Sequence, residues 1–127
     1  MSFATDIYTL LSTTDGVSDI VGSRISPYVR NTGDEFPAVV FQIPREEIES
    51  DSDGRDLMRI ATIEITCLAR TYIDADLLAE AVVIAVKGAT PVARSLTIDR
   101  DFGDPYDGSQ DLVYRSTVTA TLTGSTT

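Results

Sequence analysis

The segment MRIATIEITCLARTYIDADLLAEAVVIAVKG, residues 58–88, decides the fold because its hydrophobic period changes partway along it. In the first half, small and apolar side chains alternate with polar ones, which predicts a strand over residues 58–70 with one buried face. That buried face is predicted to carry Ala61, Ile63, Ile65, Cys67 and Ala69. The opposite face is predicted to carry the polar residues Thr62, Glu64, Thr66 and Arg70.

In the second half of this segment the spacing of apolar residues becomes helical. Thr71 and Asp74 stand at the positions of an N-terminal capping box, with an acid where Glu or Gln is commoner. Gly88 is placed to end the helix. The segment therefore predicts a strand that passes directly into a helix over residues 71–87.

This helix has few polar positions, which are Asp76, Glu80 and Lys87 on one narrow stripe. A helix that is apolar around most of its circumference is buried on more than one side. In a domain of this length one side packs against the sheet, and we expect the other to contact a neighbouring subunit. The residues predicted for that subunit interface are Leu77, Val83 and Val86.

Outward from this segment, residues 3–12 predict a short amphipathic helix, and residues 17–21 predict a second helical turn that Gly22 stops. Residues 38–43 form a β-branched and aromatic run that predicts a strand, weakened beyond Pro44. This strand and the strand at 58–70 are expected to pair as a hairpin.

Further strands are predicted over residues 96–99 and 112–122, and residues 123–127 are predicted to be a loose C-terminal tail. The chain has 127 residues, which fits a single domain spanning residues 1–127. The predicted class is α/β (α+β), with two main helices packed against a mixed or mostly antiparallel sheet of about four to five strands.

Two predicted loops carry 11 of the 20 acidic residues, and the net charge of the chain is −10. The first loop, residues 46–56, is expected at the tip of the hairpin, and the second covers residues 99–111. The acids predicted to face a channel or a partner are Glu46, Glu47, Glu49, Asp51, Asp53, Asp56, Asp101, Asp104 and Asp107. Solvated loops remain the simpler alternative.

Catalytic, cofactor-binding and metal-binding residues are not predicted anywhere in the chain. The absence of histidine removes the commonest general base and the commonest transition-metal ligand. Glu49, Asp51 and Asp53 imitate the first ligands of an EF-hand loop, but Ile60 stands where the closing acid is required. Cys67, the only cysteine, falls on the apolar face of its strand and is predicted to be a buried, inert thiol.

The acidic balance also argues against binding along DNA, because such binding usually needs a basic patch. It leaves open an acidic inhibitor that imitates DNA and is directed at a host protein. A small hydrolase that uses a pair of carboxylates is a more remote alternative.

Three motifs in a fixed order resemble the tail-completion, or tail-terminator, family of tailed bacteriophages. They are VGSRISP at residues 21–27, PAVVFQ at residues 37–42, and CLARTY followed by ADLLAEAV within residues 67–82. The resemblance covers residues 5–88, whereas the chain beyond residue 94 is similar only in its pattern of strands.

The resemblance implies a non-catalytic virion protein that forms a ring, usually a homohexamer, which caps the tail tube and joins it to the head. The implied partners are other copies of this chain, the tail-tube protein and the head–tail connector proteins. DNA would pass through the ring without specific binding, and assembly would take place in the host cytoplasm without a membrane. Another neck component, such as a connector or a head-closure protein, remains open as an alternative.

Overall fold

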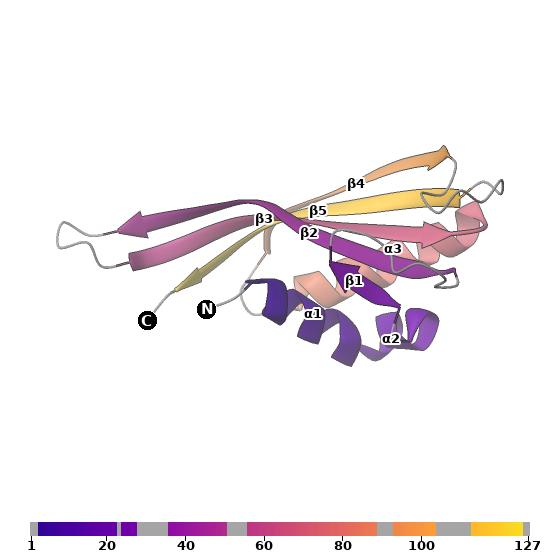
Figure 1. Ribbon diagram of the computed structural model, residues 1–127, viewed down its shortest axis with the longest axis horizontal. Coiled ribbons are helices and arrows are strands. Elements are labelled where there is room, and N and C mark those ends of the chain that lie inside the picture. Colours follow the sequence, from indigo (N-terminus) through magenta and orange to yellow (C-terminus); the bar gives the residue numbers. More distant parts are fainter. Residues whose placement is uncertain are drawn as a thin grey trace.

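The computed structural model describes residues 3–22, 24–27, 36–50, 56–88, 93–103 and 113–125 (Figure 1). The elements in chain order are α1 (Phe3–Thr13), α2 (Asp15–Val21), β1 (Ile25–Pro27), β2 (Ala38–Ser50), β3 (Asp56–Ala69), α3 (Tyr72–Lys87), β4 (Ala93–Gly103) and β5 (Val113–Ser125). The strands form one sheet in the order β1-β2-β3-β5-β4, with β1 parallel to β2 and the other pairs antiparallel. This confirms the predicted mixed α/β class, with three helices in the described residues where two main helices were predicted.

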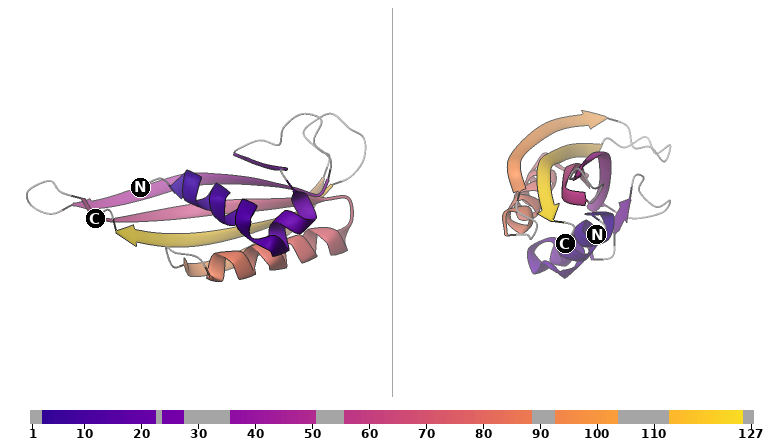
Figure 2. Two further views of the ribbon diagram at one scale, coloured as in Figure 1. Left: turned by 90° about the horizontal axis from the view of Figure 1, so that it is seen from below. Right: turned by 90° about the vertical axis from the view of Figure 1, so that its left-hand side faces the viewer.

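The helices lie together on one face of the sheet (Figures 1 and 2). Helix α3 packs on β3 and β5, α1 lies against β1 and β2, and α2 contacts both of the other helices. The core fills the space between the two layers. Five residues at its centre are at most 4% exposed, and they are Phe41, Ile63, Ile65, Leu78 and Val82. The predicted buried face of β3 is therefore confirmed, because Ala61, Ile63, Ile65, Cys67 and Ala69 are all fully buried.

Helix α3 begins as the capping pattern predicts. The hydroxyl of Thr71 accepts a hydrogen bond from the backbone N–H of Asp74 over 3.1 Å. This bond satisfies one of the N–H groups that the first turn of a helix leaves without a partner. At the other end the N–H of Gly88 donates to the carbonyl of Ile84, and the helix stops there.

The VGSRISP motif has a structural role at the junction between α2 and the sheet. Gly22 ends α2 with φ of 57°, a left-handed conformation that favours glycine. Arg24 then donates from Nε to the carbonyl of Pro37 over 2.8 Å and from Nη2 to the carbonyl of Ile20 over 3.2 Å. Arg24 thus ties the end of α2 to the start of β2, which sets β1 beside that strand. The sequence did not predict β1 as a strand, because three residues are too few to show a period.

Strand β2 runs past Pro44, contrary to the prediction that the strand weakens there. The register shifts between Gln42 and Arg45, so that β2 has one residue more than β3 at that point. A bulge of this kind accommodates a proline, which has no N–H to donate to the ladder. Residues 45–50 continue the strand opposite residues 56–62, and the hairpin reaches beyond the helices at the left of Figure 1.

The predicted loop at residues 46–56 is therefore mostly strand. Glu46, Glu47 and Glu49 belong to β2, and Asp56 is the first residue of β3. Asp51 and Asp53 lie outside the described residues. The strand was missed because charged residues outnumber apolar ones along it, although pairing with β3 still satisfies its backbone groups.

The second predicted acidic loop is corrected in the same way. Strand β4 spans Ala93–Gly103, where only residues 96–99 were predicted, and it contains Asp99 and Asp101. Asp104 and Asp107 lie outside the described residues.

Strand β5 also runs further than predicted. It continues to Ser125, and residues 123–125 pair with residues 58–60, so these three residues are strand and not a loose tail. Residues 126 and 127 lie outside the described residues.

Candidate functional surfaces

A line of apolar side chains runs along the outer side of α3. Ile73, Leu77 and Ile84 are 68%, 58% and 69% exposed, and Tyr72 at the start of the helix is 53% exposed. The spacing of four and seven residues places the first three on one stripe of the helix. An isolated domain seldom exposes large apolar groups together in this way, and such a patch marks a surface that contacts another protein. We call Ile73, Leu77 and Ile84 the α3 stripe.

The three predicted interface residues fall in different places. Leu77 is part of the α3 stripe, whereas Val83 is half-buried and packs against the core. Val86 is 1% exposed and belongs to the core, which corrects its assignment to a subunit interface. It lies four residues after Val82 and eight after Leu78, on the side of α3 that faces the sheet. The sequence reasoning missed Ile73 and Ile84, and the helical spacing from Leu77 was the signal that identifies them.

Helix α3 is fixed to the sheet beside this stripe by polar and aromatic contacts. Arg100 of β4 donates from Nε to Oδ1 of Asp76 over 2.9 Å, and this bond raises the pKa of the Arg100 guanidinium. Tyr72 meets Tyr114 of β5 edge to face, with ring centroids 6.3 Å apart. The stripe is therefore held on a helix with a fixed position relative to β4, the outermost strand of the sheet.

The face of the sheet that carries no helix has a different composition. We call it the helix-free face. Its centre is a grid of nine side chains from β3, β5 and β4, aligned in three rows by the strand register. The rows are Thr66, Thr117 and Asp99; Glu64, Thr119 and Thr97; and Thr62, Thr121 and Ser95. Seven of the nine are hydroxyl side chains and two are acids, so the surface is polar and carries no positive charge in the grid itself.

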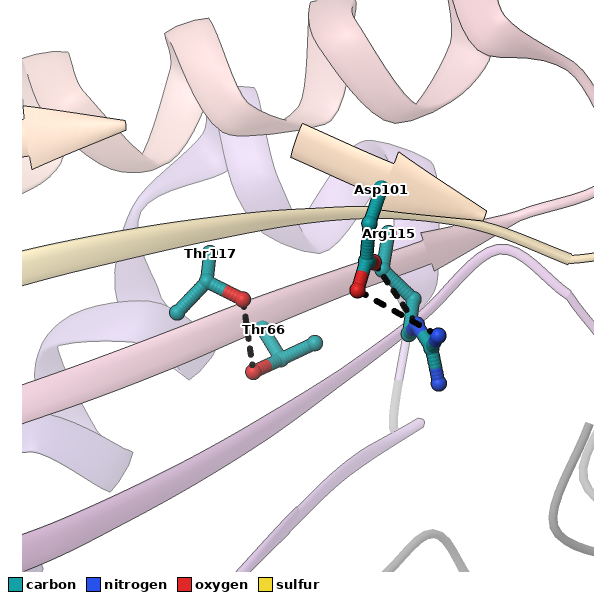
Figure 3. Close-up of polar contacts among 4 residues, drawn as sticks. All are labelled: Thr66, Asp101, Arg115 and Thr117. Atoms are coloured by element: carbon teal, nitrogen blue, oxygen red, sulfur yellow. Dashed lines mark hydrogen bonds and ion pairs between the residues drawn. The ribbon is translucent and has the colours of Figure 1, made fainter. Parts of the chain in front are cut away.

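Several polar groups on the helix-free face form hydrogen bonds or ion pairs with one another. The hydroxyl oxygens of Thr66 and Thr117 lie 3.3 Å apart across β3 and β5, as Figure 3 shows. In the same figure Arg115 donates to both carboxylate oxygens of Asp101, over 2.8 Å and 3.3 Å. A two-pronged pair of this kind fixes both side chains in geometry as well as in charge.

Two further pairs extend this pattern toward β2. Gln42 donates from Nε2 to a carboxylate oxygen of Glu64 over 2.6 Å. Arg45 forms an ion pair with Glu47. Arg45 and Arg115, which the strand register places on this face, therefore each have an acid of the same chain as partner.

The predicted acidic residues do not gather in loops within the described residues. Strand alternation places Glu47, Asp99 and Asp101 on the helix-free face. Glu46 lies opposite Ala61, on the helix side of the sheet, in the part of the hairpin that extends beyond the helices. The side-chain positions of Glu49, Asp51, Asp53, Asp56, Asp104 and Asp107 are outside what the structure describes.

A reactive thiol, a metal site and a membrane-spanning helix are the other features that the described residues could have provided. Cys67 is fully buried, and burial raises the pKa of its thiol to about 12, which confirms the predicted buried thiol. The described part of the chain brings together no group of three acidic or cysteine side chains able to hold a metal ion. Among the described helices, none is both long enough and apolar enough to cross a membrane.

The chain resembles known proteins both in sequence and in structure. A sequence model of the family described as "Tail completion protein gp17" matches residues 5–121. No curated protein matches the sequence significantly. A chain from the virion of a native gene transfer agent particle is similar in structure, with a TM-score of 0.59 and 15% sequence identity. The similarity covers 97% of this chain and 96% of that one, so the fold is shared over nearly the whole domain.

Proposed function

Because the chain belongs to the family of tail completion protein gp17, we propose that it forms a ring that caps the tail tube and joins it to the head. Membership of this family makes the chain a structural protein of a phage-like tail or neck, and a component of the virion. The ring, its subunit number and its position at the end of the tube are the finer parts of the proposal. No catalytic role is proposed for any residue.

The observation that carries self-assembly is the α3 stripe. Its three side chains lie on the outer side of a helix whose other face is already buried in the core, so no element among the described residues covers them. Covering large apolar side chains stabilises an assembly by about 1.5–3 kcal/mol for each side chain that is fully buried. We propose that the neighbouring copy of this chain covers the stripe.

The two outer strands of the sheet support the same arrangement. Strand β4 lies at one edge, and at the other edge the three-residue β1 covers only residues 39–41 of β2. A ring requires two different surfaces on each subunit, because every copy contacts one neighbour on each side. The α3 stripe and β4 lie on one side of the domain, and β2 lies on the other. The proposed partners at the ends of the ring are the tail-tube protein and the head–tail connector proteins.

The acidic residues were expected to face the channel or to contact a partner ring. For Asp51, Asp53, Asp104 and Asp107 this remains a proposal about segments outside the described residues. Glu47, Asp99 and Asp101 support the channel alternative, because they share one polar face of the sheet. In the proposed function, DNA passes through the ring without being bound.

The proposed function is tested by removing this chain from the particle that encodes it. Electron microscopy should then show full heads that are not joined to tails, and tails of irregular length. Supplying the wild-type chain should restore joined particles. Joined particles with normal tails in its absence would contradict the proposal. Light scattering on the purified protein gives the mass of any ring that it forms alone.

A further inference from the structure

We propose that the helix-free face of the sheet is the channel wall of the ring, the surface past which the DNA moves. This inference rests on the proposed function, and it names the surface and the chemistry of that surface. The surface is an array of hydroxyl groups with more acids than arginines, and the arginines that the strand register places on it are paired with acids of the same chain.

The first argument is the distribution of exposed apolar side chains. The large hydrophobic residues that are exposed in the described part of the chain are Tyr8, Ile48, Tyr72, Ile73, Leu77 and Ile84. Tyr8, Tyr72 and the α3 stripe are on helices, and Ile48 lies on the helix side of the hairpin, opposite Arg59. The helix-free face therefore has none of these side chains. Among the broad faces of the domain, it is the one least in need of cover by another protein.

The second argument is charge. The described strands place four acids on this face, Glu47, Glu64, Asp99 and Asp101, against the two arginines Arg45 and Arg115. Each of the two arginines is held by an acid of its own chain. A phosphate that approaches this part of the face meets net negative charge, and Arg45 and Arg115 are each already paired with an acid. Binding along DNA depends on positive groups that replace the counterions of the phosphates, so this face is built not to hold DNA.

The third argument is that several of the polar side chains form hydrogen bonds with one another. Thr66 pairs with Thr117, and Gln42 donates to Glu64. Side chains engaged in this way gain little by bonding to a passing base or phosphate. The backbone beneath them is a ladder of strands in the middle of the sheet, which fixes the surface in place (Figure 3). Such a wall allows DNA to slide, and it repels phosphates only within about 8–10 Å at ordinary ionic strength.

The test introduces positive charge on this face without disturbing the fold. Thr97 and Asp99 are exposed on β4, so Thr97→Lys with Asp99→Lys is expected to leave the free energy of unfolding nearly unchanged. The matched control is Thr9→Lys, at an exposed position on α1 on the other side of the domain. Each variant replaces the wild-type chain in the particle. Tail length and head joining are scored by electron microscopy, and release of packaged DNA is followed with a DNA-binding dye.

The double lysine variant is expected to give joined particles with normal tails that release DNA about tenfold more slowly, or stop partway, with the delay relieved by added salt. The Thr9→Lys control should release DNA at the wild-type rate. Failure of heads and tails to join in the double variant would show that the face contacts protein, and would overturn the inference. Normal joining with a normal release rate would place the face outside the channel, and would also overturn it.

Failure of this inference can be distinguished from failure of the proposed function. If particles without the chain join and release DNA normally, the proposed function itself is wrong, whatever the lysine variant does. If the double variant is poorly folded, circular dichroism shows it, and Thr97→Lys alone then decides. A single lysine in every copy of a ring still places a band of positive charge around the channel.

Discussion

The outer side of α3 and the helix-free face of the sheet are both surfaces of one small domain, yet they differ in almost every property. The α3 stripe exposes three large apolar side chains that have no cover among the described residues. The helix-free face exposes hydroxyls and acids; Thr66 bonds to Thr117 across two strands, and Asp101 accepts from Arg115. The difference supports the proposal that one surface contacts protein and the other does not. The proposed ring needs both properties.

Leu77 and Leu78 give the sharpest contrast between the α3 stripe and the core, because they are adjacent residues of the same type. Leu78 is fully buried and Leu77 is 58% exposed. We expect Leu78→Ala to lower the free energy of unfolding by about 2–5 kcal/mol, because it leaves a cavity in the core. Leu77→Ala should change it by about 0.5 kcal/mol or less. Urea denaturation of dilute protein measures both, and equal losses would show that α3 is oriented differently.

The second prediction concerns the α3 stripe. Leu77→Asp should weaken self-association by about thirtyfold or more, corresponding to roughly 2 kcal/mol for a central interface residue. Val83 is a poorer choice for this variant, because it packs against the core and its loss would disturb the fold. Light scattering over a range of concentrations gives the mass of the assembly, and Thr9→Asp on α1 serves as the control. An unchanged assembly in Leu77→Asp would remove the α3 stripe from the interface.

The third prediction concerns the start of α3, on which the position of the stripe depends. Thr71→Ala removes the hydroxyl that accepts from the N–H of Asp74, and should cost about 1 kcal/mol of stability. Thr71→Ser keeps the hydroxyl and should lose much less. Thermal denaturation followed by circular dichroism compares the two variants. A serine variant that is as unstable as the alanine variant would mean that the hydroxyl is not what matters.

The smallest expected effect compares the two faces of the sheet through thiol chemistry. Cys67 lies fully buried on the helix side, and burial raises the pKa of its thiol to about 12. A thiol reagent at pH 8 should leave folded wild-type protein unlabelled and react after denaturation. Thr97→Cys in a Cys67→Ala background should label at once, because Thr97 is exposed on the helix-free face. Rapid labelling of native Cys67 would contradict the described core.

The raised pKa of Cys67 also makes the stability of the folded protein depend on pH. The unfolded chain loses the thiol proton at a lower pH than the folded chain, so ionisation favours unfolding. The contribution of Cys67 to stability is complete below pH 9 and declines as the pH rises from about 9 toward 12.

The elements that the sequence predicted well are those with a strong period. The alternation along β3 and the capped helical pattern of α3 carry many residues each, so local irregularities do not hide them. The elements that it missed or shortened are those whose stability comes from neighbours. Strand β4 carries polar and charged residues at most positions, and it becomes a strand because β5 satisfies its backbone. Strand β1 has three residues and depends on the hydrogen bonds of Arg24 at its start.

The candidate surfaces were predictable in part for the same reasons. The excess of apolar residues on α3 indicated that some of them would lie outside the core, and Leu77 is one that does. Val86 was misassigned because nearly every side of this helix is apolar, so the sequence does not indicate which side faces the sheet. The helix-free face was not anticipated as a functional surface, because its three rows come from strands that are far apart in the sequence. Only the strand register brings Thr66, Thr117 and Asp99 into one row.

The most direct test of the central claim is a high-resolution electron microscopy reconstruction of the tail end and neck of the particle, with this chain located in it. The account predicts a closed ring of copies between the tail tube and the head. In that ring the α3 stripe of each copy is covered by its neighbour, and the helix-free face lines the channel. A chain found away from the neck, or a ring in which Ile73, Leu77 and Ile84 face solvent, would contradict the account.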